Sequence, residues 1–463
     1  MIHELDGRPA FSIAFPLGLQ HVLTMFVGNL APVLIISSVV NESSGEVIVT
    51  PIQKIVMIQC AMLVSGLATL LQLYPVKIGR FRIGGGLPIV MGTSFVFVPT
   101  MIVIGQTYGV NAIFGATLLG GLAEIALGIF LKPLKQILTS LVIGCVLLSV
   151  GLNLLPVGIQ YFAGGSGAHK AAENVERLSA AGMEIPSEIS RAAADYGSWQ
   201  NLLIGFTVFL VIVLLQRYGR GMMSSMSILM GIIAGYALSF ALGIVDVSAV
   251  ANASAASAPI PFFIRPEFHT ETMVSIALLY VICGLETMGN VNGITVAAFG
   301  REATNAEVSG AVIADGVGCM FASAFNALPN TAFGQNAGIV AMTKIVNRWC
   351  VATGAFVLIA AGFFPKVGAV FSIMPQSVLG GAVITVFGMI MINGIKLICL
   401  GGLTDRKVMV VAVTFGLGYA MSKTPLLIGV MPEPLAFIFQ DSSIAVCIVA
   451  ILANLLFVGR ARQ

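Results

Sequence analysis

Long apolar segments follow one another along nearly the whole chain, and this pattern restricts it to folds that a lipid bilayer can hold. About 20 apolar residues in a helix match the hydrocarbon thickness of a membrane. Charged residues occupy only 9% of the 463 positions, whereas soluble domains carry about 25%. The sequence therefore predicts an all-α polytopic membrane protein. The predicted apolar segments are Ile13–Val40, Ile52–Tyr74, Gly86–Ile104, Ala112–Leu131, Ile137–Pro156, Leu202–Leu215, Ser227–Gly243, Met273–Val291, Ala311–Phe325, Trp349–Phe364, Val370–Ile392, Met409–Met421 and Leu435–Val458.

A polar stretch, residues 326–348, interrupts this pattern. Pro329 cannot continue a helix, and Gly334 permits backbone angles that other residues avoid. From Gln335 to Asn347 the sequence predicts a half-helix, too short to cross a bilayer. Broken backbone at membrane depth survives only when buried in protein or lining a watery cavity, and secondary transporters place substrates there. We expect a substrate site here; a polar loop between two spans is the alternative.

The two halves of the chain share spacings that predict an internal repeat. With the half-helix there are fourteen elements, seven per half, so the second copy enters the membrane from the opposite side. We therefore expect two inverted seven-segment repeats, with segments 3 and 10 each built as a short extended strand plus a half-helix. These two breaks should face each other near the midplane. The matching positions are Leu87, Pro88 and Ser94 with Leu328, Pro329 and Gln335, and Ser140, Gly144 and Gly151 with Ser377, Gly381 and Gly388.

Basic residues are distributed unequally between the two sides of this topology. Sixteen of the 23 fall on one side, which the positive-inside rule assigns to the cytoplasm together with both termini. They are Arg8, Lys77, Arg80, Arg82, Lys132, Lys135, Arg217, Arg220, Arg301, Lys344, Arg348, Lys396, Arg406, Lys407, Arg460 and Arg462. The other seven are Lys54, Lys170, Arg177, Arg191, Arg265, Lys366 and Lys423.

The longest polar connection, Tyr161 to Ser198, lies on the predicted outer side. It predicts one short amphipathic helix near Ala171–Ala181, either as a lid or as a tolerated surface insertion. The seven cysteines fall singly in apolar segments, so we expect buried thiols and neither a metal site nor a cofactor. The net charge of +3 is spread over the loops, which argues against a nucleic-acid partner. The N-terminal residues lack the pattern of a cleavable signal peptide.

Four ionisable side chains fall inside apolar segments, where a charge is costly and usually functional. Glu286 lies mid-segment, and we expect it to bind substrate or a proton. Asp315 precedes a glycine at a close packing point, so it either carries a proton or holds backbone amides. His21 is either a hydrogen-bonded strut or part of a substrate or proton site. Glu124 follows Gly120-Gly121 and predicts a structural helix contact.

The half-helix carries a recognisable signature. Gln335-Asn336-Ala-Gly338, followed by Thr343 and Arg348, resembles the motif of the nucleobase–ascorbate transporter family. The resemblance extends over nearly the whole chain. It implies that Asn336, Gly338, Thr343 and Arg348 are structural motif residues, with Asn336 tying the half-helix to a neighbour.

The same resemblance implies a substrate site in which Glu286 and Gln335 hold a purine from two sides. A carboxylate accepts N–H groups and a Gln amide both donates and accepts, which suits the edge of a xanthine. Phe95 and Phe333 could enclose the flat ring, beside Ser94 and Gly334. Relatives that carry uracil tend to have Glu at the position of Gln335, and those that carry ascorbate have Pro. Glutamine indicates oxidised purines.

Two positions depart from the family pattern. Ser94 stands where xanthine-selective bacterial members tend to have Asn, so selectivity for xanthine alone is not expected. Asn290, one turn after Glu286, replaces an acid found in some members, which leaves fewer candidate proton sites.

The resemblance implies a proton-coupled symporter of the cytoplasmic membrane that imports xanthine and uric acid by alternating access. Proton coupling would involve Glu286, Asp315 and His21. A core domain (residues 1–135 and 272–366) would move against a gate domain (136–245 and 367–463) in a homodimer. A uracil or other nucleobase permease, or an anion transporter of the same architecture, remains an alternative. A membrane-embedded enzyme is not expected, because no nucleophile, base or metal cluster has suitable spacing.

Overall fold

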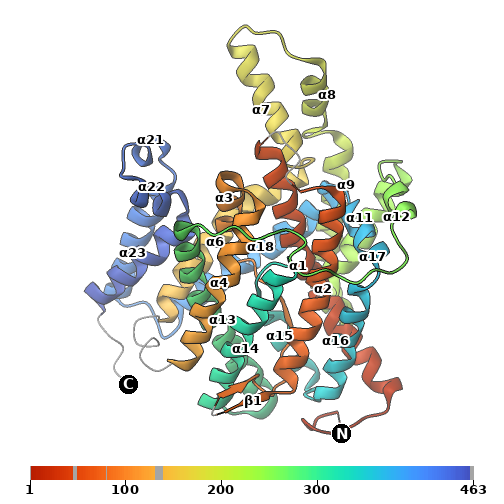
Figure 1. Cartoon of the computed structure of the whole chain (residues 1–463), viewed down its shortest axis with the longest axis vertical. Helices are drawn as coiled ribbons and strands as arrows, with labels where there is room; N and C mark the ends of the chain where they lie inside the picture. The colour runs from red at the N-terminus through yellow and green to blue at the C-terminus, as the bar shows by residue number, and fades with distance from the viewer. Residues whose placement is uncertain (1, 45–48, 80, 131–138, 459–463) are drawn as a thin grey trace.

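The computed structural model describes residues 2–44, 49–79, 81–130 and 139–458, and nearly all regular structure in them is helical (Figure 1). Within these ranges, eight helices are long and apolar enough to cross a membrane. Two further helices, α16 (Arg348–Gly362) and α17 (Pro365–Ser372), are bent by 83° at a short break, and counting them as one span gives nine. Five basic residues used for the predicted orientation lie outside the described residues: Arg80, Lys132, Lys135, Arg460 and Arg462.

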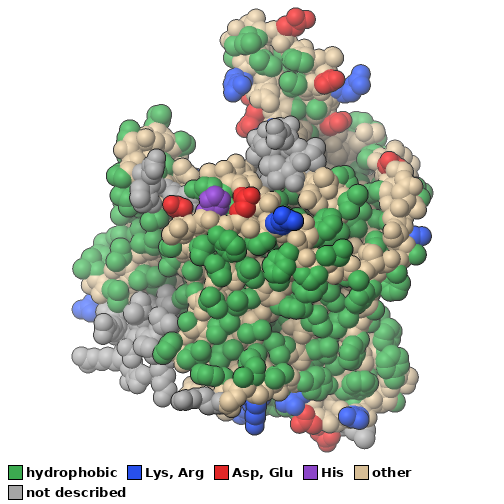
Figure 2. Space-filling model, viewed as in Figure 1, with side chains coloured by type: hydrophobic (Ala, Val, Ile, Leu, Met, Phe, Trp, Pro, Cys, Tyr) green, Lys and Arg blue, Asp and Glu red, His purple; other side chains and the backbone are tan. Residues whose placement is uncertain are grey.

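The surface agrees with a position in a membrane. Figure 2 shows a broad hydrophobic belt around the middle of the visible face, with charged side chains gathered above and below it. Such a belt is what a bilayer requires of a spanning protein, because unpaired charges are costly in hydrocarbon.

The first half of the chain contributes helices to both helix groups. Its elements are α1 (Phe11–Ser44), α2 (Pro51–Leu73), β1 (Val76–Ile78), β2 (Phe81–Ile83), β3 (Met91–Thr93), α3 (Val98–Tyr108), α4 (Val110–Ile129), α6 (Ser140–Phe162), α7 (Ser166–Ala180), α8 (Ser187–Asp195), α9 (Trp199–Tyr218), α10 (Met222–Ser225), α11 (Ser227–Ala241) and α12 (Ser248–Asn252).

The second half adds helices to both groups. Its elements are α13 (Thr270–Phe299), α14 (Asn305–Ala324), β4 (Asn330–Ala332), α15 (Gly334–Thr343), α16 (Arg348–Gly362), α17 (Pro365–Ser372), α18 (Gln376–Cys399), α19 (Asp405–Val413), the π-helical turn η1 (Thr414–Tyr419), α20 (Ala420–Ser422), α21 (Pro425–Ile428), α22 (Glu433–Gln440) and α23 (Ser442–Phe457).

Two groups of helices pack among themselves. Helices α1, α2, α4, α13, α14 and α16 form one group, and α6, α9, α11, α18 and α23 form the other. Within the second group, glycines bring α6 and α18 together: a Cβ on Gly144 would lie 2.7 Å from the Gly394 carbonyl oxygen. Close approach of this kind lets helices associate without a hydrophobic driving force.

Segments 3 and 10 are broken, and the sequence predicts that their breaks face each other. In the structure their strands, β3 and β4, form an antiparallel pair. Met91, Gly92 and Thr93 of β3 lie opposite Ala332, Thr331 and Asn330 of β4. A short helix follows each strand, α3 after β3 and α15 after β4. Backbone pairing between the strands satisfies groups that would otherwise be unpaired at membrane depth.

Polar side chains of α1 and α2 hold β3 in place. The buried Asn29 Oδ1 accepts hydrogen bonds from the Thr93 amide at 2.9 Å and from the Thr93 and Ser65 hydroxyls at 3.0 and 2.7 Å. The Thr69 hydroxyl accepts from the Met91 amide at 2.9 Å. These contacts explain why polar residues occur in otherwise apolar helices.

The half-helix α15 is shorter than the sequence predicts. It ends at Thr343 rather than at Asn347, because Lys344 adopts a left-handed conformation with φ of 56°. Asn347 instead caps the next helix, its side chain accepting from the Cys350 amide at 3.2 Å.

Several further boundaries differ from the predicted ones. The predicted segment Leu435–Val458 is divided at Asp441 into two helices. The predicted segment Val370–Ile392 is broken before Pro375, which cannot continue a helix, and α18 runs on to Cys399. The connection after Tyr161 forms two helices, α7 and α8, where one was predicted, and they project from the top of the molecule in Figure 1. Cys399 is exposed at the end of α18, whereas the other six cysteines are buried as predicted.

Candidate functional site

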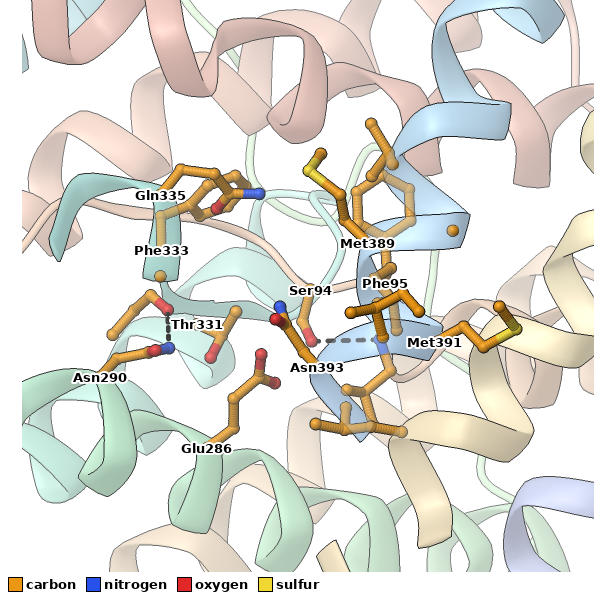
Figure 3. Close-up of a pocket in the computed structure, with 18 of the residues that line it drawn as sticks. Ser94, Phe95, Glu286, Asn290, Thr331, Phe333, Gln335, Met389, Met391 and Asn393 are labelled. Atoms are coloured by element: carbon orange, nitrogen blue, oxygen red, sulfur yellow. Dashed lines mark hydrogen bonds between the residues drawn. The ribbon is translucent and has the colours of Figure 1, made fainter. Parts of the chain in front are cut away.

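A cavity of about 570 Å³ lies where the strand pair β3–β4 faces helix α18 (Figure 3). One wall comes from β3 and its following turn, α13, β4 and the start of α15. The opposite wall comes from α6, α9 and α18. Its lining residues reach the exposed side chains of Gln216 and Lys396 near the ends of α9 and α18. The cavity therefore lies between the two helix groups and opens at that end.

Glu286 contributes the carboxylate that lines the cavity. It extends from α13 toward the centre, between Thr331 and Asn393 (Figure 3). Its Oε2 is buried and has no hydrogen-bond partner among the described residues. Since a buried carboxylate oxygen without a donor is costly, this atom is free to accept an N–H or to bind a proton.

Gln335 lies on the far side of the cavity from Glu286 (Figure 3). It is exposed at the first turn of α15, directly after Gly334. The first backbone N–H groups of a helix lack intrahelical partners and carry partial positive charge. The site thus has an acceptor on one side, and an amide with helix N–H groups on the other.

Phe333 and Phe95 both line the cavity. Two glycines make room for the Phe333 ring, because a Cβ on Gly28 or Gly92 would lie 2.7 or 2.5 Å from its atoms. The Phe95 ring meets Phe387 of α18 edge-on, with centroids 5.7 Å apart. Their enclosure of a flat substrate stays a prediction.

Ser94 also lines the cavity, at the end of β3. Its backbone N–H donates to the Pro329 carbonyl oxygen at 2.9 Å, and its hydroxyl accepts weakly from the Val96 amide at 3.3 Å. The hydroxyl hydrogen remains available, so Ser94 can present a donor to the cavity.

His21 of α1 and Asn336 of the half-helix both lie outside the cavity lining. The Asn336 side chain donates to the Pro88 carbonyl oxygen at 2.9 Å, and its Oδ1 is hydrogen-bonded to His21 Nδ1. Asn336 thus ties α15 to the segment before β3 and to α1. A role for His21 in proton coupling stays a prediction.

Asp315 is also outside the cavity lining, one layer behind β4. It is fully buried, and its Oδ2 accepts a hydrogen bond from the Thr287 hydroxyl. Thr287 in turn contacts Thr331, with 3.3 Å between the two hydroxyl oxygens. Asp315 is therefore connected to the cavity through one hydroxyl.

The remaining motif residues, Thr343, Arg348 and Gly338, lie outside the cavity lining. The Thr343 hydroxyl donates to the Ile339 carbonyl oxygen at 2.8 Å and accepts from the Ile345 amide at 3.3 Å. Arg348 binds the Gly86 carbonyl oxygen through Nε at 2.9 Å and Asp6 through Nη1 at 2.6 Å. Gly338 is exposed, and no described atom lies within 4 Å of where its Cβ would stand.

The wall formed by α18 was not predicted as part of the site. It contributes Thr385, Met389, Asn393 and Lys396, among others. Gly388 could have indicated this wall, because it is equivalent to Gly151 in the predicted internal repeat. Gly151 packs tightly on Met391, whereas Gly388 lines the cavity and has open space beside it.

Comparisons with known proteins identify relatives over the full length. A model of a family described as "Permease family" matches residues 12–189 and 179–427. The uric acid permease PucJ of Bacillus subtilis (strain 168) is 31% identical over 451 residues, 97% of this chain and 93% of that protein. The xanthine permease of the same strain is 30% identical over 456 residues, 97% of this chain and 95% of that one.

The fold also resembles a solved transporter structure. The transmembrane domain of a cyanobacterium bicarbonate transporter, BicA, superimposes with a TM-score of 0.57 at 13% identity, over 98% of this chain and 100% of that one. This likeness concerns the fold alone. The family match over most of the chain and the full-length relatives lead to one conclusion: the chain belongs to the xanthine/uracil permease family and is a multi-pass membrane transporter, not an enzyme.

Proposed function

We propose that this protein is a proton-coupled symporter that imports oxidised purines, xanthine and uric acid, across the cytoplasmic membrane. The observation that carries the proposal is the buried Oε2 of Glu286, which has no hydrogen-bond partner among the residues that the structure describes. It lies in a cavity that also presents the Gln335 amide and two aromatic rings. A carboxylate accepts purine N–H groups, and an amide can pair with an alternating donor and acceptor edge. The uric acid and xanthine permeases among the relatives support this substrate class.

Alternating access would move one helix group against the other. The separate packing of the two groups supports a core domain of residues 1–135 and 272–366 and a gate domain of residues 136–245 and 367–463. The proposal also comprises fourteen elements in two inverted repeats, and a homodimer. Protonation of Glu286 or Asp315 would accompany substrate movement, with His21 as a further candidate.

The proposed orientation of the protein in the membrane rests on the unequal distribution of its basic residues. With both termini in the cytoplasm, Lys396 lies on the cytoplasmic side. The cavity reaches Lys396 and Gln216, so the structure would be inward-facing, ready to release a substrate into the cell.

The test is uptake of labelled xanthine by cells that express the protein, with and without an uncoupler, competed with a panel of purines, uracil and inorganic anions. The proposal expects uncoupler-sensitive uptake that xanthine and uric acid inhibit. Inhibition by uracil but not by purines would favour the nucleobase alternative. Inhibition by anions alone would favour an anion transporter, against which Glu286 already argues, because a carboxylate facing the site repels anions.

A further inference from the structure

A pair of buried carboxylates lies one layer behind the cavity. Glu124 of α4 and Asp315 of α14 are both 0% exposed. Their carboxylate oxygens and the Cys319 Sγ lie within 4.8 Å of one another. The predicted helix contact at Glu124 is present: a Cβ on Gly120 would lie 2.8 Å from the Tyr280 ring, and one on Gly121 would lie 2.6 Å from Met320. Packing alone does not require an acid at this position.

Glu124 and Asp315 together have more hydrogen-bond acceptor atoms than there are donors around them. Asp315 receives one hydrogen bond from Thr287 and a distant contact from Cys319 Sγ at 4.0 Å. Neither carboxylate oxygen of Glu124 accepts a hydrogen bond from a donor group in the described part of the chain. The Asp315 carboxylate lies within hydrogen-bonding reach of the Glu124 side chain. The other ionisable groups that face Glu124 are Cys319 of α14, and Tyr280, Cys283 and Glu286 of α13. None of these groups is a cation.

Two facing carboxylates in such surroundings cannot both be ionised, because each charge destabilises the other and both are removed from water. An ionised carboxylate only accepts hydrogen bonds, whereas a protonated one also donates. One proton between Glu124 and Asp315 would therefore supply the missing donor. A hard metal cation needs six or more oxygen ligands, and this group offers two carboxylates and a thiol.

The pair is connected to the cavity through Thr287. Its hydroxyl donates to Asp315, lies 3.3 Å from the Thr331 hydroxyl and 3.5 Å from the Ala332 amide nitrogen. Thr331 and Ala332 both line the cavity. A second proton on the pair would release the Thr287 hydroxyl hydrogen from Asp315, and that hydrogen could then turn toward β4.

We propose that Glu124 and Asp315 bind the transported proton as a pair, with Thr287 relaying their state to the substrate cavity. The inference rests on the proposed proton-coupled uptake and deepens it. It adds an acid on α4 to the coupling machinery of a chain that has Asn290 where some relatives carry an acid.

The test uses purified full-length protein in proteoliposomes. Glu124→Gln keeps the shape of the side chain but cannot take up a proton. It should retain ligand-induced thermal stabilisation by xanthine and retain counterflow without a pH gradient. Accumulation driven by a pH gradient should be lost. Glu302→Gln, an exposed acid just before α14, is the matched control and should behave like wild type.

The outcomes separate the two claims. If wild-type protein shows no accumulation driven by a pH gradient, the proposed function fails. If the wild type accumulates xanthine and Glu124→Gln does so equally, only the proton pair is overturned. Wild-type accumulation that requires sodium rather than a pH gradient would also overturn it.

A second variant distinguishes a folding defect from the loss of the proton-binding pair. The exchange Glu124→Asp with Asp315→Glu keeps two acids in the pair. Recovered accumulation in this double variant supports the pair even if Glu124→Gln is poorly folded. Loss of counterflow and of ligand stabilisation in both variants would make Glu124 a structural residue and overturn the proposal.

Discussion

Asn290 donates a hydrogen bond of 2.7 Å from Nδ2 to the carbonyl oxygen of Ala332. The contact fixes the end of β4 against α13, and it brings the Asn290 Oδ1 to within 2.9 Å of where a Cβ on Gly334 would stand. Asn290 thus supports the strand that leads into the half-helix. This close approach favours a glycine at position 334, because an added Cβ would displace the Asn290 amide.

Gly334→Ala should weaken substrate binding. The added methyl group would displace the Asn290 side chain from Ala332, at a cost of about 1 kcal/mol for one hydrogen bond. The matched control is Gly338→Ala on the same helix, where open space and ordinary backbone angles predict a gain in stability of roughly 0.4–1 kcal/mol. Thermal melting and xanthine competition in both variants measure this. Equal effects at the two glycines would contradict the packing argument.

Glu286→Gln should abolish active xanthine uptake while the protein still reaches the membrane. The substitution removes the negative charge that would hold purine N–H groups or a proton. The control is Glu271→Gln, an exposed acid in the first turn of the same helix, which should retain uptake. Membrane abundance and initial uptake rates are compared in the same cells. Wild-type uptake by Glu286→Gln would remove this residue from the site.

Ser94→Asn should narrow the substrate range toward xanthine. Uric acid carries an additional C8 carbonyl and N–H, and a serine leaves room and a rotatable hydroxyl for that edge. An asparagine would fill the space and weaken uric acid by about 1–3 kcal/mol, the scale of one unmatched polar contact. The readout is the ratio of inhibition constants for the two purines, with the exposed Ser187→Asn of α8 as control. An unchanged ratio would mean that Ser94 does not face the imidazole side of the substrate.

His21 offers a way to separate a strut from a proton carrier. His21→Gln keeps a donor for the Asn336 Oδ1, so uptake should stay sensitive to an uncoupler. His21→Ala leaves that buried oxygen unpaired and should lower stability by about 1–3 kcal/mol. Melting temperatures and the effect of the uncoupler on uptake are measured in both variants. Transport by His21→Gln that no longer responds to the uncoupler would instead assign His21 to proton coupling.

The interruption of the helix between Pro329 and Gly334 was predictable from the sequence, because its causes are local. Pro329 and Gly334 interrupt a helix wherever they occur, and the spacing shared with Pro88 and Ser94 indicated a second break. The pairing of Gly92 with Thr331 then confirmed that the two breaks meet. The end of α15 was predicted wrongly because the left-handed turn at Lys344 is not evident from a lysine.

The contribution of α18 could not be predicted in the same way. Asn393 and Lys396 lie near the polar end of a long apolar helix, and such an end has the same sequence pattern whether it meets a membrane surface or a cavity. Glu124 was interpreted as structural for a similar reason. Its glycine neighbours indicated packing, but only the fold places it beside Asp315.

The most direct test of the account is xanthine uptake by purified protein in proteoliposomes under an imposed pH gradient. With the interior of the proteoliposomes alkaline, proton-coupled import predicts accumulation of xanthine above its external concentration. That accumulation should collapse on addition of an uncoupler and should be inhibited by uric acid. Uptake that only equilibrates, at the same level with and without the gradient, would contradict proton-coupled purine import.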